Sequence, residues 1–295
     1  MSKRSYSLGD RMMLGAFYFV LALFAVYCLV PFMTVVSGSI TSEQTLVKYG
    51  YSIFPRDLSF DAYKLLLGTD VVFNAYGVTI FVTCVGTVLS MIMTSALAYA
   101  ISVKSVKYRN HIAFYVFFAM LFKGGLVPTY ILISKYLHLK DTIWVLIIPA
   151  LINPWNMFLL RNFFNTIDEA LAESAKIDGA NDIYILFRII LPVSLPAIAT
   201  ISLFYALAYW NEWFRAMLFI GDERLHPLQY LIMKVVRNLD FATQIADQVT
   251  VPGYIVPSST TRLATAVVTI GPIVFLYPFL QKYFVKGLMV GSVKG

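Results

Sequence analysis

The sequence predicts an all-α integral membrane protein with six transmembrane helices, because of its composition and its charge pattern. Hydrophobic residues make up 59% of the 295 residues and charged residues 13%, whereas soluble domains average about 25% charged residues. Five stretches without a charged residue each supply the roughly 20 residues that a helix needs to cross a bilayer. They lack the alternating pattern of barrel strands, so helices, which satisfy their own backbone hydrogen bonds in lipid, are predicted.

The six predicted spans comprise these five stretches and one less regular stretch. They cover residues 14–37, 75–102, 112–134, 142–163, 189–212 and 263–281. The first span has no small-residue cleavage site after it, so we predict an uncleaved helix rather than a signal peptide. The third span is the less regular one, because Lys123-Gly124-Gly125 and Pro128 interrupt its apolar run. Four prolines are predicted to kink or end helices: Pro31, Pro149, Pro154 and Pro192.

Basic residues decide the predicted orientation of the spans. Three Lys or Arg residues lie in each of four segments that six spans would place on one side: the two tails, the loop before the third span, and the stretch before the fifth counted from Arg161 at the end of the fourth span. The loops of the other side carry mixed charge. Because cytoplasmic loops are enriched in Lys and Arg, both termini and the polar stretch 165–192 are predicted to be cytoplasmic. The net charge of +7 then reflects orientation in the lipid bilayer and does not indicate nucleic-acid binding.

The polar stretch 165–192 is predicted to form two short helices with a sharp break between them. Thr166 and Glu169 have the spacing of a capping box at a helix start. Gly179 suits the left-handed position that ends a helix, and either Asn181 or Asp182 can cap the helix that follows. The small residues before the break predict a slim, rigid element that protrudes from the cytoplasmic surface and can enter a partner's cleft.

The spacing of residues 173–192 resembles the EAA loop in membrane subunits of binding-protein-dependent ABC importers, which is that family's docking surface for an ATPase. The resemblance implies that eight residues couple this chain to an ATPase: Glu173, Ser174, Ala175, Asp178, Gly179, Ile189, Leu191 and Pro192. Ser174 stands where the family usually has Ala, and both are small enough for close packing. The alternative is a loop helix that simply lies on the membrane surface.

Four further segments resemble the smaller permease of carbohydrate importers of the maltose and multiple-sugar class. They are Phe122–Tyr130, Arg161–Phe164, Tyr209–Trp213 and Gln281–Gly287. The resemblance implies uptake of an oligosaccharide and four kinds of partner: a second homologous permease, two ATPase subunits, an extracellular solute-binding protein and the lipid of a bacterial inner membrane. The phosphate-binding pattern G-x-x-x-x-G-K-[ST] is absent from the sequence. We therefore expect this chain to be a translocating subunit and not an enzyme, with no cofactor of its own and with ATP and Mg²⁺ on the ATPase.

The resemblance also divides the chain into three regions. Residues 1–74 would hold the amino-terminal tail, the first transmembrane helix and the first outer loop. Residues 75–281 would form a permease core of five transmembrane helices that includes the cytoplasmic stretch 165–192. Residues 282–295 would be a cytoplasmic tail. The outer loops, 38–74 and 214–261, are expected to be a short folded cap and a longer polar stretch with a short helix near residues 229–237.

Four residues are candidates for the substrate path, each with a plainer alternative. A cation at the bilayer centre costs at least about 2.5–3.5 kcal/mol, so Lys123 either lines the path or marks a shorter span and reaches the outer interface. Glu212, between two tryptophans, is either a substrate ligand or an interfacial anchor. Tyr209 and Asn211 can bond sugar hydroxyls, yet aromatic residues are abundant here. Hydroxyl residues along the second span suit helix–helix bonding as well as a pore.

Other functional classes find little support in the sequence. An ion-driven secondary transporter, the main alternative, would need paired intramembrane carboxylates or unwound helices, and Glu212 near a span end is the main candidate. A membrane enzyme would need a catalytic constellation within the spans, and none is seen. Cys28 and Cys84 predict no disulfide or metal framework, and the three histidines have no metal-ligand spacing.

Overall fold

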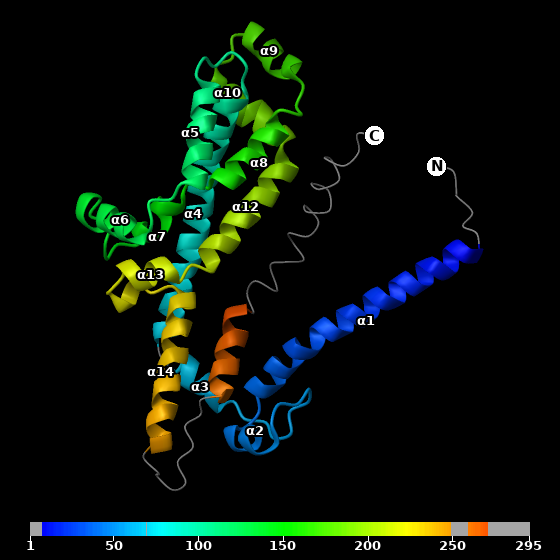
Figure 1. Ribbon diagram of the computed structural model, residues 1–295, viewed down its shortest axis with the longest axis vertical. Helices are drawn as coiled ribbons and strands as arrows, with labels where there is room; N and C mark the ends of the chain where they lie inside the picture. The colour runs from blue at the N-terminus through cyan, green and yellow to red at the C-terminus, as the bar shows by residue number, and fades with distance from the viewer. Residues whose placement is uncertain (1–7, 69, 249–258, 271–295) are drawn as a thin grey trace. The chain divides into compact units, whose positions relative to one another are not determined.

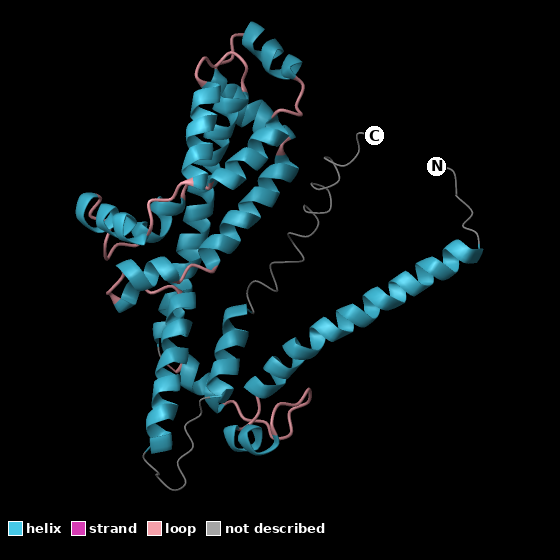
Figure 2. Ribbon diagram, viewed as in Figure 1, coloured by secondary structure: helices cyan, strands magenta, loops and turns pink. Residues whose placement is uncertain are grey.

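The computed structural model describes residues 8–68, 70–248 and 259–270 (Figure 1). Over these residues the chain consists of helices and loops (Figure 2), and the one isolated β-bridge joins Thr41 to Leu58. The predicted all-α class is confirmed for the described residues. The described residues form two compact units, one of residues 8–68 with 235–248 and 259–270 and one of residues 70–234.

The first unit contains a long apolar helix and two short ones. These are α1 (Leu8–Ser39), α2 (Glu43–Tyr49) and α3 (Asp61–Leu67). A stretch of α1 over Met12–Ser39 is long and apolar enough to cross a membrane, and none of its most apolar window is buried within the chain. Pro31 lies inside α1 and does not end it. A surface of this kind is stable only against lipid or another subunit.

The loop predicted as a folded cap is tied to a helix over residues 259–270. The carboxylate of Glu43 accepts hydrogen bonds from the backbone N–H groups of Ser259 and Thr260, at 3.0 and 2.8 Å, and from the Thr260 hydroxyl at 2.6 Å. An acidic side chain at a helix amino end also complements the helix dipole. Residues 271–281 of the sixth predicted span lie outside the described residues.

The second unit is built around α4 (Asp70–Ser102), a continuous helix that includes the second predicted span. Helices α8 (Pro154–Phe164) and α12 (Leu195–Trp210) pack along it (Figure 1). The other helices of this unit are α5 (Arg109–Leu121), α6 (Leu126–Ile131), η1 (Leu132–Tyr136), α7 (Trp144–Ile147), η2 (Ile148–Ala150), α9 (Glu169–Ile177), α10 (Asp182–Ile185), η3 (Leu186–Ile190), α11 (Leu191–Val193), α13 (Phe214–Phe219) and η4 (Glu223–Leu225). Completely buried side chains from four helices, among them Ala98, Ile147, Leu160 and Ile185, form its apolar core.

Three predicted spans are each formed by two helices that meet at a bend. The pairs, with their bend angles, are Arg109–Leu121 and Leu126–Tyr136 (112°), Trp144–Ala150 and Pro154–Phe164 (49°), and Asp182–Val193 and Leu195–Trp210 (91°). The described residues therefore offer two helices that can cross a membrane, or up to five if each bent pair is one span. The number of six and the orientation stay predictions.

Local chemistry explains where the bends fall. Gly125 has φ +86°, a left-handed conformation that glycine adopts without steric cost, and it lies in the break that the sequence indicated at residues 123–125. Pro154 starts α8 after the Asn153 cap. Pro192 was predicted to kink or end a helix within the fifth span. It lies inside α11, and the bend falls two residues later at Ser194, just before Pro196, whose missing N–H cannot continue the backbone pattern.

The long outer loop also differs from the prediction. Helix α14 (Leu228–Gln248) has 21 residues, whereas a short helix near residues 229–237 was expected. Apolar residues recur at helical intervals along the first part of α14, which the polar average of the loop concealed.

Candidate functional site

The stretch predicted to couple the chain to an ATPase begins with α9, and its amino end differs from the prediction. Asp168 is the N-cap, and its carboxylate accepts a hydrogen bond from the N–H of Ala170 at 3.0 Å. The predicted capping box at Thr166 is wrong, because the Thr166 hydroxyl donates to the carbonyl oxygen of Phe163 at 2.7 Å instead. Thr166 is engaged by the end of α8, which leaves Asp168, the next capping residue in the chain, to start α9.

The carboxyl end of α9 is closed by a Schellman motif, as the predicted stop at Gly179 required. Gly179 has φ +84°, its N–H bonds the carbonyl of Lys176 at 3.0 Å, and the N–H of Ala180 bonds the carbonyl of Ala175 at 2.9 Å. The side chain of Asn181 then caps α10 by accepting from the N–H of Tyr184 at 2.8 Å. Hydrogen bonds therefore fix both the end of α9 and the start of α10.

Two ion pairs brace this break. Lys176 of α9 and Asp182 of α10 lie 2.9 Å apart, and the hydrogen bond to Asp182 raises the pKa of Lys176 above its usual value. Lys104, in the loop after α4, pairs with Glu169 at the start of α9 at 2.5 Å. Exposed ion pairs contribute little stability, about 0–1 kcal/mol each. Because these two pairs join α9 to the loop after α4 and to α10, they restrict the direction of α9.

The eight predicted coupling residues share this segment but not one surface. Glu173, Ser174, Asp178, Gly179 and Pro192 are exposed, whereas Ala175, Ile189 and Leu191 are half-buried against the helical core. The exposed residues are free for a partner, and the half-buried ones anchor the segment. Ile177 and Ile183 flank the break and are 87% and 71% exposed. The sequence analysis missed both, although an apolar residue beside a helix-ending glycine is a usable signal.

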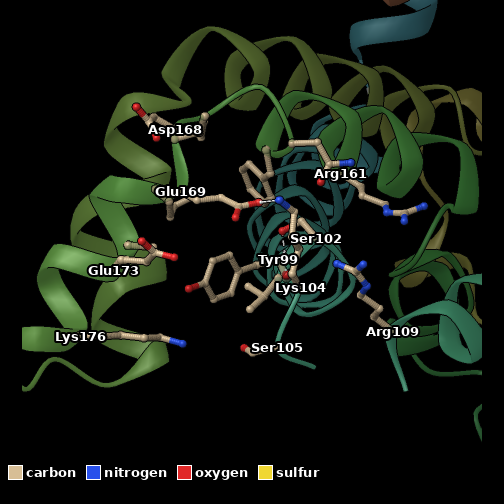
Figure 3. Close-up of a pocket in the computed structure, with 16 residues that line it drawn as sticks. Tyr99, Ser102, Lys104, Ser105, Arg109, Arg161, Asp168, Glu169, Glu173 and Lys176 are labelled. Carbon is tan, nitrogen blue, oxygen red and sulfur yellow. Dashed lines mark hydrogen bonds and ion pairs between the residues drawn. The ribbon is translucent and has the colours of Figure 1, made fainter. Parts of the chain in front are cut away.

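A pocket of about 610 Å³ opens between α9 and the adjoining ends of α4, α5 and α8. Figure 3 shows Glu169, Glu173 and Lys176 on the α9 side and Arg109 and Arg161 on the opposite side. The Lys104–Glu169 pair crosses the pocket.

A network of hydroxyl groups, hereafter the hydroxyl network, joins α4 to α12 far from this segment. Tyr209 lies 2.8 Å from the hydroxyl of Ser90, and Tyr205 lies 2.7 Å from that of Thr94. Both tyrosines also reach the α7–α8 bend: Tyr209 donates to the carbonyl of Ile147 at 3.2 Å, and Tyr205 accepts from the N–H of Asn153 at 2.9 Å. Helix–helix bonding therefore accounts for Ser90 and Thr94.

The four candidates for the substrate path do not form one cluster. Lys123 is exposed at the break between α5 and α6, whereas Tyr209 is 2% exposed in the hydroxyl network. Asn211 donates to the carbonyl of Leu207 at 2.8 Å and accepts from Gln229 at 3.2 Å.

Glu212 and its neighbour Arg215 form an ion pair with side chains only 10% and 24% exposed. The carboxylate of Glu212 also accepts the backbone N–H of Arg215 at 2.8 Å. Arg215, with Tyr209 and Asn153, lines a second pocket of about 340 Å³. The sequence analysis missed Arg215, and the i,i+3 spacing from Glu212 was the signal for it. Among the described residues there is no group of three His, Cys, Asp or Glu that could hold a metal ion.

Comparisons with known proteins agree with the helical, apolar fold described above. The chain is 42% identical over 278 residues to the polygalacturonan/rhamnogalacturonan transport system permease protein YtcP of Bacillus subtilis, covering 94% of this chain and 96% of YtcP. It is 42% identical over 267 residues to the protein LplC of the same organism, covering 90% of each. A chain in the crystal structure of a bacterial ABC transporter involved in the import of the acidic polysaccharide alginate matches with a TM-score of 0.80 and 34% identity, covering 95% of this chain and 99% of that one.

The model of one protein family matches nearly the whole chain, from residue 4 to residue 290. That family consists of membrane-embedded subunits, which agrees with the apolar helices found here. The chain belongs to the family described as the binding-protein-dependent transport system inner membrane component.

Proposed function

We propose that this chain is the transmembrane permease subunit of an ATP-driven ABC importer that takes up an oligosaccharide delivered by an extracellular binding protein. Family membership supports the permease role. The hydrogen-bonded end of α9 at Gly179 supports the coupling role. Two ATPase subunits and a second, homologous permease complete the importer. ATP and Mg²⁺ bind the ATPase subunits, and this chain performs no covalent chemistry.

The proposed substrate is a fragment of an acidic polysaccharide. The name of YtcP gives polygalacturonan and rhamnogalacturonan, and the matching solved structure concerns the acidic polysaccharide alginate. The substrate path would pass near the second pocket, where the Arg215 guanidinium, paired with Glu212, lies beside Asn153 and Tyr205. Lys123, Tyr209, Asn211 and Glu212 remain candidates for this path.

The observation that carries the coupling proposal is the rigidity of the cytoplasmic break. A contact that transmits movement must not deform, and here hydrogen bonds hold the two helix ends at the break while the Lys176–Asp182 ion pair spans it. When the ATPase dimer closes, it would move α9, and α10 and η3 would pass that movement to α12. Access to a central cavity would then alternate between the two sides of the membrane.

The first test is purification of the tagged chain from its native membrane in mild detergent, with mass spectrometry of the proteins that accompany it. We expect a second permease and an ATPase with the phosphate-binding pattern. Reconstituted into liposomes, the complex should take up galacturonan oligomers only with ATP on the cytoplasmic side, and maltotriose serves as the neutral control. A chain that purifies alone and transports along an ion gradient without ATP would instead be a secondary transporter.

A charge reversal tests the coupling surface separately. Glu173 is exposed and would pair with a cation of the ATPase, so Glu173→Lys should abolish ATP-driven uptake while the protein still inserts. Ser174→Ala, which restores the residue usual in the family at the next position, is the matched control and should transport normally. Normal uptake by the Glu173→Lys variant would remove this residue from the docking surface.

A further inference from the structure

The pocket beside α9 holds two arginines that the coupling role does not use. Arg109 and Arg161 line it and are half-buried. None of the ion pairs among the described residues involves either arginine, and the buried Nε of Arg161 has no hydrogen-bond acceptor. Half-buried guanidinium groups without partners are costly, which makes this pair the strongest unexplained feature of the second unit.

The rest of the chain offers these arginines few acceptors. Residues 1–7, 249–258 and 271–295 contain no Asp or Glu. Within the pocket, Glu169 is paired with Lys104, and the carboxylate of Asp168 caps α9. Glu173 lies on the opposite wall, with α9 (Figure 3). The side of the pocket that holds the arginines is therefore positive, and an anion from outside the chain would neutralise it.

The chemistry of the two side chains indicates which anion. Guanidinium groups bind phosphate through paired, charge-assisted hydrogen bonds. The same pocket is lined by the apolar side chains of Val103, Phe164 and Ile190, which suits a ligand that is apolar beyond its charged group. A phosphate attached to a hydrophobic body meets both requirements.

Residues beside the pocket place it at the level of lipid headgroups. Tyr108, next to Arg109, is 58% exposed, and the Lys107 ammonium lies 5.5 Å from the centre of its ring. Tyrosine and basic residues of this kind gather at membrane interfaces, and basic pockets between helices on the cytoplasmic side bind anionic headgroups.

We propose that Arg109 and Arg161 bind the phosphate of an anionic phospholipid from the cytoplasmic leaflet. The proposal rests on the membrane orientation in the proposed function. A lipid held there lies between α9 and the ends of α4, α5 and α8, so its presence would brace the coupling segment from the membrane side.

Native mass spectrometry of the purified complex tests this site without any need for transport. The complex is mixed with equal amounts of phosphatidylglycerol and phosphatidylcholine, and retained lipid is counted for the wild type and three variants. Because charge-assisted bonds are worth about 1.5–3 kcal/mol, the double variant Arg109→Gln/Arg161→Gln should lose about tenfold or more in phosphatidylglycerol retention. Arg161→Lys keeps the positive charge but loses the paired N–H donors of the guanidinium group. Its phosphatidylglycerol retention should lie between those of the wild type and the double variant. Lys140→Gln, which removes an exposed charge outside the pocket and its adjoining loop, should match the wild type.

Three results would overturn the proposal. Equal phosphatidylglycerol retention by the wild type and the double variant would show that the lipid binds elsewhere. Thermal stabilisation by inorganic phosphate alone, in neutral-lipid nanodiscs and dependent on both arginines, would identify a soluble anion as the ligand. Carbodiimide cross-linking of the amine introduced by Arg161→Lys to a carboxylate of the ATPase would assign the pair to that subunit. A variant that loses lipid must also elute as one symmetric peak with its partners, and Arg161→Lys provides the test if the double variant does not assemble. Because retention is read from mass, it remains interpretable if ATP-driven uptake fails.

Discussion

The helix break at Gly179 and the hydroxyl network between α4 and α12 are both hydrogen-bonded, but they are built in opposite ways. The break is exposed, and its bonds join residues within a few positions of each other. The hydroxyl network is buried, and its two hydroxyl pairs join residues 119 and 111 positions apart. The break owes its shape to local sequence, whereas the network exists only once the helices have packed.

This difference predicts where substitutions will act. In the break, nothing lies within 4 Å of a Cβ built on Gly179, so a new side chain strains only the backbone. In the network, a Cβ on Gly86 would meet three ring atoms of Tyr209 at 2.7 to 2.9 Å. Changes in the break should therefore affect transport and spare folding, and changes in the network should affect folding first.

The largest expected effect is the loss of transport on Gly179→Val. A left-handed conformation costs a branched residue roughly 1–2 kcal/mol, so the Schellman motif should open and release the direction of α9. We expect ATP-driven uptake in liposomes to fall to background while the amount of inserted protein stays unchanged.

Gly50→Val is the matched control for this variant. Gly50 has φ +74° and also has no atom within 4 Å of a built Cβ, but it ends α2, outside the coupling segment. If both variants lose uptake equally, backbone strain in general is responsible and the coupling segment has no special role.

The next effect is on stability and comes from Gly86→Ala. The ring of Tyr209 is held by its hydroxyl bonds and cannot move aside freely, so the added methyl group should cost about 1–3 kcal/mol. Gly77→Ala, on the same helix with nothing within 4 Å, should stabilise the protein by about 0.5–1 kcal/mol. Thermal unfolding in detergent measures both, and equal shifts would show that α4 and α12 are not in close contact here.

A smaller effect is expected from the hydroxyl of Tyr209 itself. Tyr209→Phe leaves Ser90 and the carbonyl of Ile147 without this partner, and interhelical hydrogen bonds in membranes average roughly 0.6 kcal/mol. In a double-mutant cycle with Ser90→Ala, the double variant should lose less stability than the sum of the losses in the two single variants. Strict additivity would mean that the two hydroxyls do not interact.

The smallest expected effect is that of Lys123→Ala. If Lys123 lines the substrate path, the Michaelis constant for an anionic oligomer should rise severalfold while that for a neutral one changes little. Unchanged kinetics for both substrates would favour the alternative, in which Lys123 reaches the outer interface from the α5–α6 break.

Much of the coupling segment could be predicted because its determinants are short-range. The left-handed Gly179 and the Asn181 cap follow from residue type and spacing, and both are observed. The capping box at Thr166 failed for a related reason: two residues competed for the same helix start, and the end of α8 engaged Thr166. Local rules identify the candidates but cannot rank them without the neighbouring helix.

The hydroxyl network was beyond sequence reasoning, whereas the i,i+3 spacing of Glu212 and Arg215 could have indicated their ion pair. Tyr209 was a candidate sugar ligand, yet its hydroxyl is bonded to Ser90 and Ile147 from other helices. Nothing in a single sequence shows which of many aromatic residues meets which hydroxyl across helices. The 91° bend at Ser194 lies two residues after Pro192, where a kink or helix end was predicted, but its angle could not be predicted from an apolar run.

That bend determines how stiff the proposed transmission is. The backbone N–H of Ser194 bonds the carbonyls of Ile190 and Leu191 at 3.0 and 3.1 Å, and its hydroxyl also bonds Ile190 at 2.7 Å. In the proposed importer, this hydrogen-bonded corner would convert a sideways displacement of the cytoplasmic helices into a tilt of α12. A more flexible corner would absorb that displacement, and ATP hydrolysis would then be uncoupled from sugar transport.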